Sequence, residues 1–150
     1  MNTSKVHWHL IRKFTDWRLL ATIIICDDSE LCRRVLRLTI ESMRNDVACV
    51  EVATGAELLN YIKANEHPSL VFLDLRMPDR DGFRTLADLQ AMEASFKDLK
   101  IVAYSVLASE ADKVRSLEAG FDAFLGKPFS RSELTLLLTN LLGGETGGFS

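Results

Sequence analysis

Acidic side chains follow two apolar runs of the sequence, at the point where each run ends. Asp27 and Asp28 come directly after the run 22–26, and Asp74 follows the run 70–73. If these runs are neighbouring parallel strands, the three acids converge at one edge of one sheet. Like charges that close raise each other's pKa unless a positive group joins them. A hard cation with oxygen ligands would fit such a cluster.

A single lysine follows a third apolar stretch. Lys127 comes shortly after Phe124-Leu125 and directly before Pro128. A lysine at a strand end usually points into water, but next to an acid cluster we expect it to belong to the same site as the acids. Asp28 has an alternative role, because it could cap the helix that begins near Ser29.

Composition and charge limit the classes of protein. The chain has 150 residues, of which 47% are apolar and 26% charged, and its net charge is -3. A chain of this length can form one domain that buries about two-thirds of its unfolded surface. Nucleic-acid binders carry a basic surface, so we expect no direct contact with nucleic acid.

The cysteines and the apolar runs indicate a cytoplasmic protein. Cys26, Cys32 and Cys49 are odd in number and form no C-x-x-C motif, which favours reduced and mostly buried thiols. The apolar segment 19–26 is short and leads into two aspartates, so we interpret it as a strand and not as a signal peptide. No run approaches the roughly 20 residues that cross a membrane.

Strands and helices alternate five times along the sequence. Short apolar runs predict strands, and amphipathic segments between them predict helices. The predicted strands are 22–26, 47–52, 70–74, 100–104 and 122–125, and the predicted helices are 29–44, 55–65, 83–94, 109–119 and 131–142. This alternation implies right-handed crossovers and a parallel sheet. We therefore predict an α/β fold with a doubly wound, five-stranded parallel sheet of the flavodoxin-like kind, in which βα is repeated five times.

Helical spacing suggests which side chains face the sheet. In helix 29–44 we expect the stripe Leu31, Val35 and Leu38 to be buried. The corresponding apolar side chains of the other helices are Leu58, Leu59 and Ile62; Ala111, Val114 and Leu117; and Leu134, Leu137, Leu138 and Leu141. Leu136 lies about opposite the stripe of the last helix and should be exposed.

Two segments lie outside the repeating unit. Residues 1–21 place Val6, Leu10, Phe14 and Trp17 at helical spacing and predict an extra N-terminal helical segment. A partner or membrane-surface helix is the alternative. Residues 143–150 are rich in glycine and predict a flexible tail. The domain itself is then 22–142.

The order of these residues resembles the response-regulator receiver domain of two-component signalling. The resemblance rests on an acid pair after the first strand, Asp74 in the segment 74–82, Ser105 after the fourth strand, and Lys127-Pro128-Phe129 after the fifth. It covers about residues 22–142. Each motif is weak alone, but the set in this order and spacing is specific.

The resemblance implies a role for each motif residue. Asp74 would be the phosphoacceptor, a carboxylate nucleophile that forms an acyl phosphate. Asp27, Asp28, Asp74 and the backbone carbonyl of Arg76 would bind Mg²⁺, which prefers a few carboxylates together with water and phosphate oxygens. Lys127 and Ser105 would contact the phosphoryl group, and the Lys127-Pro128 bond would be cis.

The same resemblance assigns two further functions. Phe124 would be the switch aromatic that turns inward when Ser105 moves to the phosphoryl group, although a simple core phenylalanine is the alternative. Arg76 and Leu107 lie two residues after Asp74 and Ser105, where the family tunes phosphoryl lifetime. Leu107 is apolar and cannot orient an attacking water, so we expect a long-lived phosphorylated state.

The expected function is that of a phosphorylation-controlled signalling protein and not of an enzyme. A histidine kinase or histidine phosphotransfer protein would donate the phosphoryl group, and an unknown downstream protein would respond. A second copy of the chain is another candidate partner, in a homodimer. A small aspartate-nucleophile phosphohydrolase usually carries a second acid where this chain has Arg76. A nucleotide or flavin binder needs a Gly-rich loop after the first strand. A receiver-fold scaffold that is no longer phosphorylated would not need the full acid set and Lys127, and a phosphate carrier without switching is a further alternative.

Overall fold

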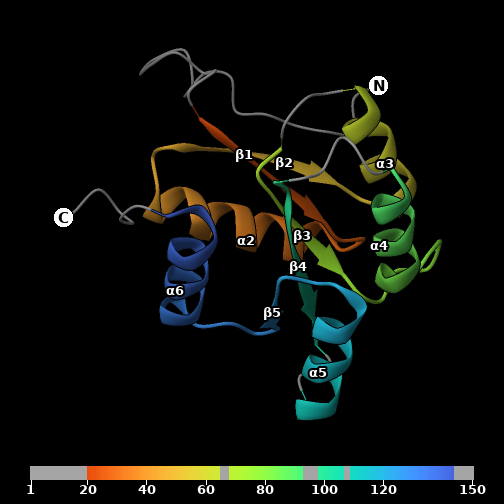
Figure 1. Ribbon diagram of the computed structural model, residues 1–150. Helices are drawn as coiled ribbons and strands as arrows, with labels where there is room; N and C mark the ends of the chain where they lie inside the picture. The colour runs from red at the N-terminus through yellow and green to blue at the C-terminus, as the bar shows by residue number, and fades with distance from the viewer. Residues whose placement is uncertain (1–19, 65–67, 93–97, 107–108, 144–150) are drawn as a thin grey trace.

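The computed structural model describes residues 20–64, 68–92, 98–106 and 109–143. Within them, one sheet of parallel strands has the order β2-β1-β3-β4-β5. Figure 1 shows the strands in the middle of the molecule, with α2 and α6 to one side and α3 and α4 to the other. The predicted fold class is therefore confirmed, while the predictions for residues 1–19 and 144–150 lie outside the described residues.

The elements agree closely with the predicted ranges. The strands are β1 (Ala21–Cys26), β2 (Val47–Val52), β3 (Leu70–Asp74), β4 (Lys100–Ser105) and β5 (Ala123–Gly126). The helices are α2 (Glu30–Met43), α3 (Gly55–Ala64), α4 (Gly82–Ala91), α5 (Glu110–Ala119) and α6 (Arg131–Leu142).

Alternate side chains of each strand enter different halves of the core. On β1, Ile23 and Ile25 face α2 and α6, whereas Ile24 and Cys26 face α3 and α4. Both faces of the sheet are covered, which explains why the strands are continuous apolar runs and do not alternate with polar residues.

Short polar residues define the helix ends. The hydroxyl of Ser29 accepts the N–H of Cys32 and caps α2, and Ser130 forms a capping box with Glu133 at the start of α6. Asp28 is therefore not the cap of α2, which leaves its carboxylate available for another role. Gly120 ends α5 with a positive φ of 117°, as a C-terminal glycine should.

The predicted buried stripe of α2 is wrong. Leu31, Val35 and Leu38 are 72%, 47% and 52% exposed, and the buried apolar residues of this helix are Leu36, Ile40 and Met43. At 100° per residue the two stripes lie on opposite faces of the helix. The helix thus carries two apolar faces, and only one of them packs on the sheet.

Helix α5 departs from the prediction in the same way. Val114 and Leu117 are about half exposed, and Ser116 is the buried residue of this helix. The expectations for α3 and α6 were better: Leu58, Ile62, Leu134, Leu137 and Leu138 are buried, whereas Leu136 is 63% exposed as predicted. Among the helices that the structure describes, none is long and apolar enough to span a membrane.

We predict that the two faces of α2 differ sharply in their effect on stability. Leu36→Ala should lower the free energy of unfolding by about 2–5 kcal/mol, because it leaves a cavity in the core. Leu38→Ala, in the same helix and half exposed, is the matched control and should stay within about 1 kcal/mol. Urea unfolding measures both. Equal losses in the two variants would contradict this orientation of α2.

Candidate functional site

The strand order places a topological switch point beside β1. The chain runs from β1 to its neighbour β2 on one side and later to β3 on the other, so the winding direction reverses between β1 and β3. Ligands of doubly wound sheets bind beyond the carboxyl ends of the strands at this point. Asp27 directly follows β1, and Asp74 is the last residue of β3.

The three predicted acids meet at this switch point. Asp27, Asp28 and Asp74 each offer one carboxylate oxygen, and these three oxygens lie within 4.8 Å of one another. Asp27 and Asp74 are buried, whereas Asp28 is exposed. A set of carboxylate oxygens that opens to solvent through one member fits a hard divalent cation that keeps part of its water shell.

Lys127 joins the two buried acids. Its Nζ donates to Asp27 Oδ2 at 2.6 Å and to Asp74 Oδ2 at 3.4 Å. The same ammonium lies 4.4 Å from the ring centroid of Tyr104. The lysine lies at the same edge as the acids and pairs with two of them, and an aromatic face that attracts cations supports its position.

Backbone amides hold the remaining oxygen of each buried acid. Asp27 Oδ1 accepts the N–H of Ser29 at 2.9 Å, and Asp74 Oδ1 accepts the N–H of Arg76 at 3.0 Å. Each carboxylate thus bonds to the turn that follows its own strand. These bonds fix the carboxylate planes before any ligand arrives.

Burial and charge shift the pKa values of Asp74 and Lys127. The pKa of Asp74 is raised to about 6, chiefly because burial desolvates the carboxylate, and the negative charge of Asp27 raises it further. The hydrogen bond from the N–H of Arg76 and the positive charge of Lys127 lower it, but they do not cancel the rise. Burial lowers the pKa of the Lys127 ammonium, but its hydrogen bond to Asp27 and the two negative charges outweigh burial and raise it. The lysine therefore stays charged while Asp74 titrates.

Gly82 allows the loop after β3 to return close to the site. A Cβ at this position would lie 2.7 Å from the carbonyl oxygen of Asp74 and 2.8 Å from the Cα of Leu75. The N–H of Gly82 donates to the carbonyl of Leu75, and the side chain of Asp81 caps α4. Only glycine leaves room for this approach of backbone to backbone.

The remaining predicted residues lie around the acids or outside the described residues. Ser105 is buried at the end of β4, and its carbonyl accepts the N–H of Lys127 at 2.9 Å. Phe124 is half-buried on β5, the Lys127-Pro128 bond is cis, and Arg76 is exposed. Leu107 lies outside the described residues. The geometry brings Ser105 to the strand edge where the acids lie.

Sequence reasoning missed two features of the site. Tyr104 was assigned only to a strand, although it directly precedes Ser105 and contacts Lys127. Glu51 was also passed over, yet it is a buried acid within an otherwise apolar strand. A charge in such a strand needs a cationic partner, so this signal was available; the partners are Arg33 and Arg37 of α2.

Fold and site together define an α/β domain with an acid cluster and a lysine at the switch point of its sheet. Residues 23–139 match the response regulator receiver domain family, and the chain belongs to this family. The resemblance seen in the sequence is thereby confirmed. Receiver domains are the signal-accepting part of two-component response regulators.

Relatives with known names support this membership. The chain is 33% identical over 114 residues to protein PilG of Pseudomonas aeruginosa, which covers 75% of this chain and 80% of PilG. It is 32% identical over 115 residues to the KDP operon transcriptional regulatory protein KdpE of Escherichia coli, which covers 77% of this chain and 48% of KdpE. The chain spans about half the length of KdpE and the other transcriptional regulators that it matches.

Solved structures of receiver domains have the same fold. The receiver domain of the Francisella response regulator 1452 superposes with a TM-score of 0.70 at 26% identity, over 81% of this chain and 95% of that one. The receiver domain of sensor histidine kinase PA1611 from Pseudomonas aeruginosa PAO1, solved with a magnesium ion in its active site cleft, gives 0.71 at 24% identity. It covers 83% of this chain and 99% of that one.

The raised pKa of Asp74 predicts a specific dependence of stability on pH without metal. The carboxyl group of Asp74 binds its proton more tightly in the folded state than in the unfolded state. Its contribution to the free energy of unfolding is therefore fully present below about pH 4 and is lost as the pH rises to about 6. Asp74→Asn removes this loss. In EDTA at pH 7 it should be more stable than wild type by about 2–3 kcal/mol, because one pKa unit corresponds to about 1.4 kcal/mol.

Urea unfolding at pH 4 and pH 7 measures this effect, and Asp79→Asn, at an exposed position in the following loop, is the control. The Asp74→Asn variant and wild type should have similar stability at pH 4. A stability difference that is the same at both pH values would contradict the raised pKa.

Proposed function

We propose that this chain is a phospho-accepting receiver of a two-component phosphorelay. In this proposal Asp74 accepts a phosphoryl group from a phosphohistidine donor in the presence of Mg²⁺, and the phosphorylated protein changes its contacts with other proteins. The observation that carries the proposal is the cluster of three carboxylates and Lys127 at the switch point of the sheet.

Asp74 is suited to act as the nucleophile. A carboxylate oxygen of Asp74 attacks phosphorus, an acyl phosphate bond forms, and the bond to the donor imidazole nitrogen breaks so that the imidazole leaves with the electron pair. Asp74 keeps one oxygen on the N–H of Arg76, and this bond favours its ionised form. A carboxylate oxygen of exposed Asp28 lies within 4.8 Å of one of Asp74, so a donor can approach the cluster from the solvent on the side of Asp28.

Mg²⁺ would be held by Asp27, Asp28, Asp74 and the carbonyl of Arg76. When bound, it would neutralise repulsion among the carboxylates and the incoming phosphoryl oxygens. The magnesium ion in the cleft of the PA1611 receiver domain supports this choice of metal, as does the donor set of carboxylate oxygens in this chain.

Lys127 and Ser105 would receive the phosphoryl oxygens. Lys127 pairs with both buried acids. A metal bound to these acids would replace the lysine as their positive partner, and the ammonium could then turn to the phosphoryl group. Ser105 is linked to Lys127 through its carbonyl. This main-chain bond holds the two residues side by side at the ends of β4 and β5.

The output surface in this proposal is built by residues 105–119, which include α5, together with β5 and α6. Val106, Val114, Leu117 and Leu136 are apolar and 49–63% exposed there. Phe124 is half-buried on β5, which pairs with β4, and would couple Ser105 to this surface as the switch aromatic. Because KdpE is named as a transcriptional regulatory protein, control of transcription is one output that we include.

The alternatives are a receiver-fold scaffold or phosphate carrier without switching, and a small aspartate-nucleophile phosphohydrolase. The position two residues after Asp74 is exposed Arg76 and not an acid, which argues against hydrolysis by a second carboxylate. NMR spectra with and without a phosphoryl mimic would separate a switch from a carrier. Shift changes limited to the loops around the acids and Lys127, with none at Phe124 or in α5, would reject switching.

We predict that Asp74→Asn abolishes phosphoryl uptake and leaves the fold intact, because the amide is isosteric but not nucleophilic. Incubation with Mg²⁺ and a small phosphodonor, followed by intact-mass measurement, should show one alkali-labile phosphoryl group on wild type and none on the variant. Asp79→Asn is the matched control and should label like wild type. Undiminished labelling of Asp74→Asn would refute the assignment of the acceptor.

We also predict that Asp28→Ala weakens Mg²⁺ binding. Wild type should bind with a dissociation constant on the order of 1 mM or below, as expected for an open site with few carboxylates. Loss of the exposed acid removes one of these ligands without disturbing the buried pair. Calorimetry or NMR shifts measure the affinity, and wild-type affinity in Asp28→Ala would exclude this residue as a ligand.

A further inference from the structure

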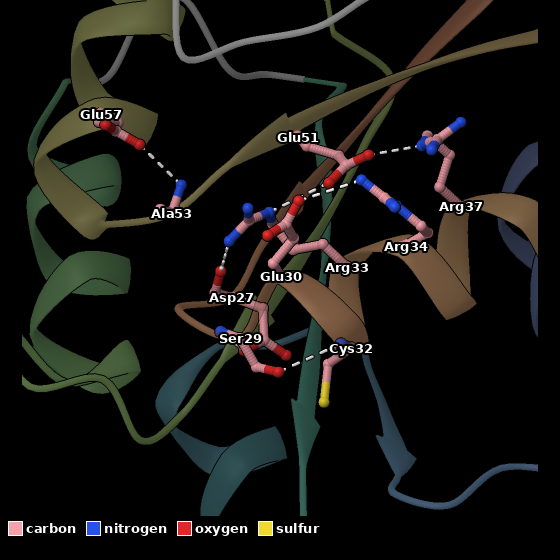
Figure 2. A network of polar contacts seen from close by, with 10 residues as sticks. All are labelled: Asp27, Ser29, Glu30, Cys32, Arg33, Arg34, Arg37, Glu51, Ala53 and Glu57. Carbon is pink, nitrogen blue, oxygen red and sulfur yellow. Dashed lines mark hydrogen bonds and ion pairs between the residues drawn. The ribbon is translucent and has the colours of Figure 1, made fainter.

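A row of alternating charges lies between α2 and β2, next to the acid cluster. Arg33 Nε contacts Glu51 Oε1 at 3.1 Å, Arg37 Nε contacts the other oxygen of Glu51, and Arg37 Nη1 contacts Glu41 at 3.3 Å. The side chains of Arg33, Arg37 and Glu51 are 15%, 8% and 8% exposed. Glu51 thus sits between two arginines at the edge strand (Figure 2).

Arg33 reaches from this row to the backbone of the acid pair. Its Nη1 donates to the carbonyl oxygen of Asp27 at 2.8 Å, as Figure 2 shows. The N–H of Asp27 donates to the carbonyl of Val52 at 3.2 Å. The backbone of Asp27 is therefore tied to β2 on both sides, directly through Val52 and indirectly through Arg33 and Glu51.

The bond from Arg33 acts on the peptide that joins Asp27 to Asp28. The orientation of the Asp27 carbonyl sets the plane of this peptide, and the plane sets the direction in which the chain enters Asp28. Asp28 is exposed, so its position depends on its backbone more than on packing of its side chain. The carboxylate of Asp27, in contrast, has two hydrogen bonds of its own.

An ion pair made only for stability would not need this bond. Glu51 already has Arg37 as a buried partner, and buried pairs are weak evidence for stability in any case. The planar guanidinium of Arg33 does what a single ammonium cannot, because it donates in two fixed directions at once, to a carboxylate and to a carbonyl.

We propose that Arg33 is a positioning residue for the metal-binding acids, held in place by Glu51. By fixing the Asp27–Asp28 peptide, it keeps the carboxylates of Asp27 and Asp28 close enough to bind one cation. This inference rests on the proposed function only in naming Mg²⁺ as that cation. Groups that orient metal ligands from behind commonly change metal affinity by about 10- to 100-fold when removed.

The test compares three arginines of the same helix. Arg33→Gln removes the bridge, Arg37→Gln disturbs the same Glu51 without touching Asp27, and Arg34→Gln changes an exposed arginine that pairs with Glu30 at 3.0 Å. Mg²⁺ titrations followed by amide NMR shifts give the affinity, and urea unfolding in EDTA gives the stability.

We expect Arg33→Gln to weaken Mg²⁺ binding about 10-fold. Arg37→Gln should lose stability but keep an affinity near that of wild type, and Arg34→Gln should change neither. If Arg33→Gln weakens Mg²⁺ binding no more than Arg37→Gln does, the row of charges is structural and the inference is wrong.

Arg33→Lys is the second variant, in case the glutamine variant does not fold. The lysine retains the charge and can pair with Glu51, so the fold should persist, but it cannot also hold the Asp27 carbonyl in a fixed direction. Weaker Mg²⁺ binding at near wild-type stability supports the inference, and wild-type affinity overturns it.

A metal-free measurement separates this inference from the proposed function. The ¹³C shift of the Asp27 carbonyl should change in Arg33→Lys and not in Arg34→Lys, whether or not the protein binds Mg²⁺. Absence of Mg²⁺ binding by wild type would refute the proposed function. An unchanged Asp27 carbonyl shift in Arg33→Lys would refute the positioning role of Arg33.

Discussion

Repulsion among three carboxylates at one edge of the sheet is the constraint around which the site is organised. Asp27, Asp28 and Asp74 bring oxygens within 4.8 Å of one another, and two of these residues are buried. Buried charges of one sign raise the free energy of the folded state unless they are paired and hydrogen-bonded. The structure relieves this cost with one lysine, two backbone amides and a protonation that the raised pKa of Asp74 makes easier.

One lysine does not balance the negative charge of three carboxylates, so the site remains sensitive to a further change of charge. Lys127 is shared between Asp27 and Asp74, with the shorter contact to Asp27. Any group that changes the charge of Asp74 also changes the attraction that holds Lys127. The ammonium of Lys127 lies over the ring of Tyr104, and its N–H donates to the carbonyl of Ser105. The lysine thus contacts β3 through Asp74 and β4 through Tyr104 and Ser105.

The helix that follows the acid pair shows where sequence patterns are ambiguous. Helix α2 has two apolar stripes at valid helical spacing, and the stripe chosen from the sequence, Leu31, Val35 and Leu38, is the exposed one. The buried stripe runs beside Arg37, a charged residue that periodicity assigns to solvent. Arg37 is buried because Glu51 of β2 provides a partner. This contact joins residues 14 apart, and a pattern within one helix does not contain it.

The sequence by itself determined the order of strands and helices, the parallel sheet, and the set of acids with Lys127 at strand ends. These follow from local rules, because apolar runs, caps and residue order are all readable along the chain. Only the tertiary structure decided which acids are buried, how Lys127 is shared, and that Arg33 connects Glu51 to Asp27. Such features depend on distances between elements remote in sequence, and they appear only when the sheet has brought its strand ends together.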